Sequence, residues 1–216
     1  MRVLVTAGPT REAIDPVRFI SNGSSGKMGY GLARAALDAG HEVVLVSGPV
    51  AIEPPAEART IEVVSANAML EAVRAELPSC DTLIMVAAVS DWRPRHASAE
   101  KLKKSEMSDR LELERTPDIL SEVSDLKGER LFVGFAAETE DLLVEAERKL
   151  RDKNLDYIVA NDVSHPEWGM ESEFNKVVLI GADGSRESMP VLPKLEVARL
   201  LIERIEAARA ACTSGS

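Results

Sequence analysis

A glycine- and serine-rich stretch with a single lysine is the part of the sequence best suited to bind an anion. It runs from Phe19 to Gly31, reads FISNGSSGKMGYG, and is followed directly by an alanine-rich helical pattern. Glycines let the backbone come close to a ligand, and a helix that begins at such a loop directs its positive dipole end at that ligand. Lys27 adds a full positive charge. The stretch therefore predicts a phosphate-binding loop, and the alternative is a turn that only connects a strand to a helix.

The next candidate is Asp91, which follows the strongly apolar run 81–89. If this run is a strand, Asp91 lies at its carboxyl end, where α/β proteins bind their ligands. A carboxylate there can bind Mg²⁺ held on phosphates, or accept hydrogen bonds from a ribose or a base. The alternative is an aspartate that only caps a loop.

Three lysines, Lys101, Lys103 and Lys104, form a dense positive cluster in an acidic chain. If the segment is extended, alternation places Lys101 and Lys103 on one side. Its position after the Asp91 loop predicts a flap that closes over phosphates, neutralises their charge and excludes water. A solvated loop is the alternative.

Polar or aromatic side chains also stand at the ends of two later apolar runs. The ring of Phe135 could pack on a nucleobase or belong to the core, and Asn161 could hold a substrate or a helix N-terminus. The three histidines are scattered, and no Ser-His-Asp or Cys-His arrangement is visible. We therefore expect neither a histidine metal site nor a catalytic triad.

An alternating series of strands and helices must position these candidates. Strands are expected at 2–7, 41–47, 60–64, 81–89, 131–138 and 156–162, and helices at 27–39, 66–77, 141–152 and 194–210. Thr116 is expected to cap a further short helix with Pro117 at its first position. A hairpin with an Asp-Gly turn follows at 175–189. The expected fold is therefore α/β, a Rossmann-like three-layer fold with a mostly parallel sheet and a C-terminal β-hairpin extension.

The parallel sheet should gather the candidates at one edge. Ligands of open α/β sheets bind beyond the carboxyl ends of the strands. That rule places Gly8, Asp91, Phe135 and Asn161 along the same edge.

Composition and charge narrow the classes of function. No linker divides the 216 residues, so a single domain is expected over 1–212, with a disordered tail at 213–216. The net charge of −10 argues against nucleic-acid or membrane-surface binding, so positive charge for an anionic ligand must be focused locally. Cys80 and Cys212 match no metal spacing and read as reduced thiols of a cytoplasmic protein. No apolar run approaches transmembrane length.

Two other functions remain alternatives. An NAD(P)-dependent oxidoreductase would carry its glycines directly after the first strand, whereas here they are delayed by about a dozen residues. It would also carry an acidic residue after the second strand, and Ser47-Gly48-Pro49 stands there instead. A non-catalytic nucleotide-binding module is the second alternative, but it has no need for a lysine flap.

Six motifs, taken together and in order, resemble the phosphopantothenate–cysteine ligase family of coenzyme A biosynthesis. They read VLVTAGPTRE-x-IDPVRFISN, SNGSSGKMG, AAVSDWRP, KLKK, GFAAET and NLDYIVANDVS. The resemblance covers the chain from Val3 to about Ile180. It implies that 4′-phosphopantothenate attacks the α-phosphate of CTP, with Mg²⁺, to give an acyl-cytidylate and pyrophosphate. The amine of L-cysteine then displaces CMP. Eukaryotic relatives use ATP.

The resemblance also implies partners. In many bacteria this ligase is the C-terminal half of a bifunctional protein whose N-terminal half is a flavin-dependent phosphopantothenoylcysteine decarboxylase. The SSGKMG form is similar to the fused type, so we expect an excised domain rather than a free-standing enzyme. The family is dimeric, and the hairpin 175–189 is a plausible pairing element because its exposed edge needs covering. A homodimer is therefore expected, with parts of the site supplied by the second chain.

Roles follow for the residues that match the motifs. The resemblance implies that Asn22 contacts the acyl-nucleotide carbonyl in the second half-reaction, and that Lys101 stabilises charge while the acyl-nucleotide forms. It places five residues at the phosphates, namely Gly8, Ser24, Ser25, Gly26 and Lys27. It places four at the nucleotide, namely Ala87, Ala88, Phe135 and Asp91, the last also as the metal ligand. Asn161 would help to hold the pantothenate, and Lys103 and Lys104 are not ranked.

Overall fold

The computed structural model describes residues 1–103, 109–138, 142–162, 165, 167–169 and 172–214. Its centre is an eight-stranded sheet with the order β12-β11-β10-β9-β6-β1-β4-β5. These strands are β1 (Arg2–Ala7), β4 (Glu42–Ser47), β5 (Arg59–Glu62), β6 (Thr82–Met85), β9 (Leu131–Glu138), β10 (Tyr157–Asp162), β11 (Phe174–Gly181) and β12 (Arg186–Pro193). Six neighbouring strands of this sheet, β10, β9, β6, β1, β4 and β5, pair in parallel. β11 pairs antiparallel with both β10 and β12. The mostly parallel sheet with a C-terminal hairpin is therefore confirmed.

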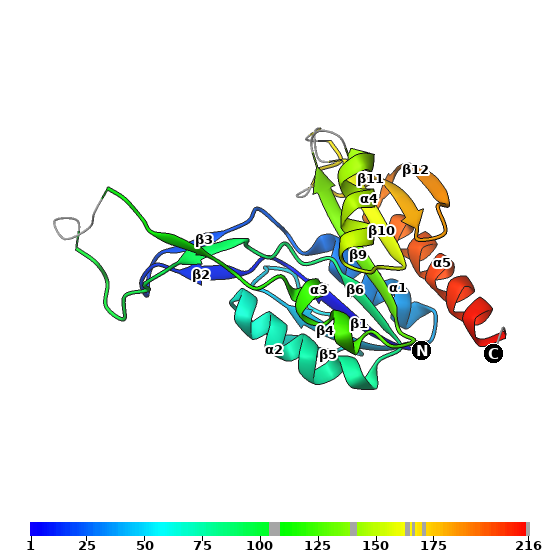
Figure 1. Cartoon of the computed structure of the whole chain (residues 1–216), viewed down its shortest axis with the longest axis horizontal. Coiled ribbons are helices and arrows are strands. Elements are labelled where there is room, and N and C mark those ends of the chain that lie inside the picture. The colour runs from blue at the N-terminus through cyan, green and yellow to red at the C-terminus, as the bar shows by residue number, and fades with distance from the viewer. Residues whose placement is uncertain (104–108, 139–141, 163–164, 166, 170–171, 215–216) are drawn as a thin grey trace.

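Helices cover both faces of this sheet (Figure 1). One face carries α1 (Lys27–Asp38) and α5 (Lys194–Ser214), and the other carries α2 (Ala66–Glu76), α3 (Ile119–Glu122) and α4 (Leu142–Asp152). The short 3-10 turns η1 (Leu77–Ser79) and η2 (Ser124–Leu126) follow α2 and α3. The three layers expected from the sequence are present.

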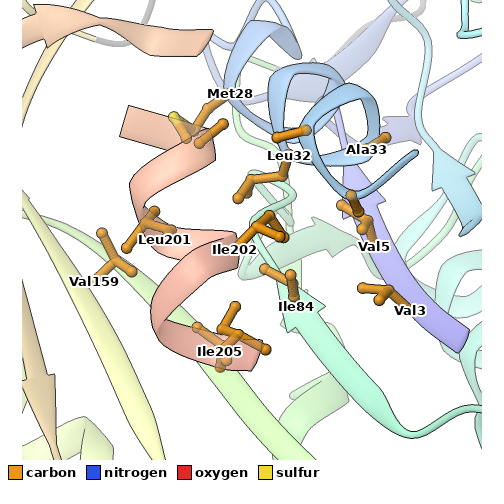
Figure 2. Packing of buried hydrophobic residues seen from close by; sticks show 14 of the residues in the cluster. Val3, Val5, Met28, Leu32, Ala33, Ile84, Val159, Leu201, Ile202 and Ile205 are labelled. Atoms are coloured by element: carbon orange, nitrogen blue, oxygen red, sulfur yellow. The ribbon is translucent and has the colours of Figure 1, made fainter. Parts of the chain in front are cut away.

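Each face of the sheet has its own hydrophobic cluster. Successive side chains of a strand point to opposite faces, so Val3 and Val5 of β1 belong to one cluster and Leu4 to the other. Figure 2 shows the first cluster, in which Leu201 and Ile202 of α5 lie among residues of α1 and the sheet. Because β1 is buried on both sides, its sequence is a continuous apolar run rather than an alternating one.

The central strand β6 is shorter than the run 81–89 predicted. After Met85 the chain leaves the sheet, and the N–H groups of Val86 and Ala87 each donate to the Thr6 hydroxyl oxygen at 3.1 Å. Ala88 then pairs with the segment after β1, since its N–H donates to Gly8 O at 2.9 Å. The apolar residues 86–89 therefore form a loop at the sheet edge. Because this loop is as apolar as the strand before it, the sequence does not show where the strand ends.

Other boundaries also differ from prediction. The cap of α3 is Asp118, not Thr116: its Oδ1 accepts from Ser121 N–H at 3.2 Å, so Pro117 lies before the helix. The Thr116 hydroxyl instead donates to Ser90 O. Thr213 and Ser214, predicted as tail, continue α5, and residues 215–216 lie outside the described part of the chain. No helix among the described residues has the length and apolar character needed to cross a membrane.

A feature that the sequence did not predict is an arm that projects from the sheet (Figure 1). We define the arm as residues 11–21 together with the described residues of 92–115. It contains two short antiparallel ribbons, β2 (Arg11–Ala13) with β3 (Phe19–Ser21), and β7 (Trp92–Pro94) with β8 (Leu113–Arg115). The two ribbons are in contact through β2 and β7. The second segment of the arm therefore begins immediately after Asp91, and it contains Lys101 and Lys103, the described lysines of the basic cluster.

Candidate functional site

The glycine-rich stretch brings the start of α1 onto the end of β1. Gly26 is the N-cap of α1, in a left-handed conformation with φ 76°, which strongly favours glycine. One turn later, a Cβ on Gly29 would lie 2.6 Å from the Cβ of Ala7, so only glycine allows this approach. These glycines therefore allow α1 to pack closely against β1, and they also leave the backbone uncovered by side chains.

The start of α1 has polar groups directed at this edge of the sheet. Gly26 supplies no side-chain cap, and the hydrogen bonding of the helix begins with Tyr30 N–H donating to Gly26 O at 3.0 Å. The N–H groups of the first turn precede that bond and add to the positive end of the helix dipole. Ser24 shapes the approach, because its hydroxyl accepts from Gly26 N–H at 3.3 Å.

A cavity of about 60 Å³, called here the smaller cavity, lies at this helix start. Six predicted site residues line it: Gly8, Ser24, Gly26, Lys27, Phe135 and Asn161. Seven further residues line it that were not predicted: Met28, Gly29, Val86, Ala136, Ala137, Asn175 and Lys194. Ser25 was predicted here, but it is not part of the lining.

Two lysines determine the charge of the smaller cavity. The Lys27 ammonium pairs with Glu173, and this hydrogen bond holds the pKa of Glu173 below its ordinary value. Lys194 is only 6% exposed, and its Nζ donates to Gly169 O at 3.3 Å. Burial, and then the nearby charge of Lys27, lower the pKa of Lys194 to about 8, while Glu173 acts in the opposite direction. The cavity is therefore flanked by two cationic side chains.

One buried acceptor in the lining of this cavity has no donor among the described residues. The side-chain oxygen of Asn161 is buried and has no hydrogen-bond partner among the described residues. Buried polar atoms are almost always satisfied, so this oxygen is suited to accept an N–H or O–H from a ligand. Asn161 thus lies in the lining of the smaller cavity, and its role in binding stays a prediction.

A second, larger cavity of about 750 Å³ lies beside the first. It contains the predicted residues Asn22, Ala87, Ala88, Asp91 and Phe135. Phe135 and Ala137 line both cavities, so the two share a wall at the end of β9. The side-chain amide of Asn22 donates to Val89 O at 2.9 Å and to Ala88 O at 3.4 Å. Asn22 therefore connects the glycine-rich loop to the loop after β6.

The larger cavity also contains charged residues that the sequence did not single out. Lys149 and Lys153 line it together with Asp118. Lys153 Nζ lies 2.9 Å from Asp118 Oδ2. Burial raises the pKa of Asp118, but the hydrogen bond and charge of Lys153 outweigh it, and the pKa lies below its ordinary value. Lys149 and Lys153 are four residues apart, a spacing that puts two side chains on the same side of a helix. This spacing was the sequence signal that could have identified them.

The two described lysines of the basic cluster do not line either cavity. Lys101 and Lys103 are exposed residues of the arm, and neither is part of the two linings. Between them, Leu102 is bonded to Asp15 and Arg18 near the turn that joins β2 to β3. Lys104 lies outside the described residues.

The donor set fits a phosphate-bound magnesium ion. No group of three or more His, Cys, Asp or Glu side chains in the described part of the chain could hold a metal by itself. Asp91 is exposed to the larger cavity, and Asp118 provides a second carboxylate in the same lining. Mg²⁺ is commonly bound through one or two carboxylates plus the phosphates of a substrate, so these residues are compatible with it.

Comparisons with known proteins show the family to which the chain belongs. Residues 1–208 match the family model described as the DNA/pantothenate metabolism flavoprotein C-terminal domain. The coenzyme A biosynthesis bifunctional protein CoaBC of Bacillus subtilis (strain 168) is 47% identical over 206 residues, which are 95% of this chain and 51% of that protein. The CoaBC of Escherichia coli (strain K12) is 42% identical over 209 residues, 95% of this chain and 51% of the relative.

Solved structures show the same fold. The crystal structure of the C-terminal domain of CoaBC has a TM-score of 0.82 and 45% identity, covering 96% of this chain and 94% of that one. The DNA/pantothenate metabolism flavoprotein from Streptococcus pneumoniae also has a TM-score of 0.82, at 27% identity, covering 96% and 99% of the two chains. The present chain spans about half the length of the curated relatives it matches. It belongs to the family of the DNA/pantothenate metabolism flavoprotein C-terminal domain.

Proposed function

We propose that this chain is a phosphopantothenate–cysteine ligase. It would join 4′-phosphopantothenate to L-cysteine through an acyl-cytidylate, with CTP cleaved to CMP and pyrophosphate. The observation that carries the proposal is the pair of adjacent cavities that share Phe135 and Ala137. A reaction between a triphosphate and a phosphorylated acid needs two anion-binding spaces next to one another, and this arrangement supports it.

The residues account for the first half-reaction. A carboxylate is a poor acyl donor, and conversion to a mixed anhydride supplies a leaving group. The reactants are all anionic, so their approach requires local positive charge in a chain of net charge −10. Lys27 and the start of α1 would supply it in the smaller cavity, and Lys149 and Lys153 in the larger one.

Asp91 is the proposed metal ligand, with Asp118 as a second carboxylate in the same cavity. Bound Mg²⁺ would neutralise negative charge on the triphosphate. Phe135 would pack against the base, and the backbone at Ala87 and Ala88 would border the nucleotide. Choice of CTP over ATP enters the proposal through the family resemblance alone.

Asn22 is proposed to act in the second half-reaction. Its side-chain amide lies at the larger cavity and already donates to backbone carbonyls there. The same N–H groups are suited to a carbonyl oxygen of the acyl-nucleotide, where they would stabilise the negative charge that develops when the cysteine amine attacks.

Lys101 is proposed to stabilise charge during acyl-nucleotide formation, as a residue of a segment that closes over the larger cavity. The proposal requires movement of the arm, because Lys101 lies outside both cavities. A Lys101→Gln variant should release pyrophosphate from CTP and 4′-phosphopantothenate more slowly than the wild type. An unchanged rate would remove Lys101 from the mechanism.

The proposal extends to the assembly and its setting. The arm exposes large apolar side chains, among them Val17 at 59%, Phe19 at 47% and Trp92 at 44%. A second copy that covers them would form the expected homodimer, and this surface is preferred here to the hairpin 175–189. Light scattering of the wild type and of a Phe19→Ser variant tests this: a monomeric wild type refutes the homodimer, and an unchanged dimer in the variant refutes the role of the arm. In the native protein we propose a cytoplasmic chain fused to a flavin-dependent decarboxylase, as the family resemblance implies; the CoaBC relatives are named bifunctional proteins.

One assay tests the central proposal. CTP, 4′-phosphopantothenate and cysteine are mixed with the protein, and pyrophosphate and the coupled product are measured, with ATP in place of CTP as one arm and omission of cysteine as another. The ligase should form product only in the complete mixture with CTP and Mg²⁺. Nucleotide binding without turnover would instead favour a non-catalytic module, and binding of NADH would favour an oxidoreductase.

A further inference from the structure

Two asparagines stand at the end of an otherwise apolar face of the sheet. Val159 of β10 and Val177 and Leu179 of β11 belong to the hydrophobic cluster that α1 and α5 cover. Side chains two residues apart in a strand point to the same face, so Asn161 and Asn175 continue this face toward the smaller cavity. Both residues are part of its lining. The face therefore changes from apolar to amide-bearing where it reaches the cavity.

The two asparagines are neighbours across adjacent strands. Asn161 pairs directly with Val177 in the antiparallel ladder of β10 and β11, and Asn175 lies two residues from Val177 on the same strand. Diagonal neighbours of this kind are roughly 7–8 Å apart. That separation leaves room between the two side chains for one small polar group with a hydrogen bond on either side. The two side-chain amides can thus contact the same part of a ligand.

Asn175 is fully buried, yet its side-chain N–H groups meet only a weak acceptor among the described residues. Its side-chain oxygen accepts from Lys176 N–H at 3.2 Å, which directs the oxygen toward the following peptide and the nitrogen away from it. The nitrogen lies 3.7 Å from Met28 Sδ, and a thioether sulfur is a weak acceptor. Because a buried N–H without a good acceptor costs free energy, this group is suited to donate to a carbonyl oxygen of a ligand.

Asn161 supplies the complementary group. Its side-chain oxygen is buried and has no hydrogen-bond partner in the described part of the chain. The hydroxyl of Thr82 is also buried without a partner there, but Thr82 begins β6, at the opposite edge of the sheet, and lines neither cavity. Asn161 differs because its unpartnered acceptor stands beside the weakly bonded donor of Asn175. Buried polar groups are usually paired, so this combination at a cavity indicates a ligand that carries both a donor and an acceptor.

We propose that Asn175 and Asn161 bind the secondary amide of the acid substrate, Asn175 as the donor to its C=O and Asn161 as the acceptor of its N–H. The proposal rests on the proposed function for the identity of that acid, 4′-phosphopantothenate, whose one amide lies between its phosphate and its carboxylate. A secondary amide presents a donor and an acceptor on opposite sides, and two such side chains complement it. Asn175 is thus a binding residue that the sequence motifs did not identify.

The test measures binding of 4′-phosphopantothenate by calorimetry to the wild type and three variants. Asn175→Ala removes the donor and Asn161→Ala removes the acceptor. Thr82→Val is the control, because it removes a buried, unpartnered hydroxyl outside both linings. Each asparagine variant should bind the acid roughly five- to 150-fold more weakly, the loss for one buried polar group left unpaired, and the control should bind it as the wild type does.

An ester analogue of the acid, with oxygen in place of the amide nitrogen, distinguishes recognition of the ligand from a structural role. The ester has no N–H for Asn161, so the wild type and Asn175→Ala should bind it more weakly than the amide. Asn161→Ala should bind the two ligands with equal affinity. A general distortion of the cavity would not abolish the difference between amide and ester in this one variant.

These measurements need no turnover, so they separate the inference from the proposed function. Weaker binding to both asparagine variants supports the pair even if no ligation is detected. Equal binding to the wild type and the asparagine variants, or no binding to the wild type, overturns the proposal even if the ligase assay succeeds. If the variants do not fold, NMR of the wild type replaces them. The acid should shift the side-chain N–H signals of Asn175 and not those of Asn154, an exposed asparagine outside both linings, and an unshifted Asn175 refutes the proposal.

Discussion

The buried carboxylate of Asp15 holds the backbone of Leu102, 87 residues away, since its Oδ2 accepts the Leu102 N–H at 3.3 Å. The same carboxylate pairs with Arg18, whose guanidinium donates to Leu102 O at 3.0 Å. The backbone N–H and C=O of Leu102, the residue between Lys101 and Lys103, are thus both hydrogen-bonded. The Asp15–Arg18 pair therefore holds the basic segment against the other part of the arm.

An Asp15→Asn variant should release this segment. The hydrogen bond from Arg18 holds the pKa of Asp15 well below its ordinary value against the effect of burial, so the carboxylate is charged and acts as the acceptor at neutral pH. The variant should show faster hydrogen–deuterium exchange in peptides that contain 98–103, and slower pyrophosphate release. The exposed Asp125→Asn serves as the control. Equal exchange in both variants would show that the segment is held by other contacts.

The same pair gives a pH dependence with a defined sign. A carboxyl group whose pKa is lowered by folding stabilises the protein above its unfolded value, near 3.8, and this contribution is lost as the pH falls below that value. The difference in unfolding free energy between wild type and Asp15→Asn should be constant from pH 7 to about 5 and should narrow below about 4. Urea unfolding across this range measures it, and a constant difference down to low pH contradicts the assignment.

Asn22→Asp should separate the two half-reactions. An aspartate cannot donate to Val89 O, and it would place a negative charge where the acyl-nucleotide carbonyl is proposed to bind. Pyrophosphate release should continue while cysteine capture slows by about 10²-fold, the usual loss for one oxyanion donor. Acyl-cytidylate should then be recovered from a quenched reaction. Asn154→Asp, which changes an exposed asparagine outside both cavities, should behave as wild type.

Asp91→Asn should weaken binding of CTP with Mg²⁺ by about 1.5–3 kcal/mol, the range for a hydrogen bond to a charged group. Calorimetry with and without Mg²⁺ distinguishes a metal ligand from a group that contacts the ribose or base. For a metal ligand the loss is confined to the titration with Mg²⁺. An equal loss in both titrations would assign Asp91 to the nucleoside instead.

Burial of Lys194 should be visible in the stability of the protein. Its pKa is lowered by burial and by Lys27 from 10.5 to about 8 in the folded state, so between these values the unfolded chain binds more protons. Stability contributed at this position therefore rises as the pH increases from about 8 to about 10.5. The unfolding free energy of the wild type should therefore increase relative to that of Lys194→Met as the pH rises from about 8 to about 10.5. A flat difference would show that Lys194 is solvated.

The parallel sheet and its helices could be predicted because their sequence patterns are local. Val3, Leu4 and Val5 form an apolar run bounded by Gly8, and the helices repeat apolar residues at helical spacing. The strands of the arm could not be predicted in the same way. β2, β3, β7 and β8 are three residues long each, too short for an alternating pattern, and their pairing partners are set by tertiary contacts.

The site was predictable where its chemistry is concentrated in a motif, and not where single residues converge from distant elements. The rule of strand ends placed Gly8, Asp91, Phe135 and Asn161 along one edge of the sheet, and in the structure these residues line the two neighbouring cavities. Lys194 was missed because a lysine at the beginning of a helix gives no sign of burial, which here depends on the packing of α5 on α1.

Phe135 and Ala137 form a wall that the two cavities share, and this shared wall constrains how the specificity of either cavity can evolve. A change in the size of either side chain alters both compartments at once, so the preference for a nucleotide and the preference for an acid cannot drift independently at these positions. Diversification of one specificity should therefore proceed through residues that border a single compartment, such as Val89 or Asn175.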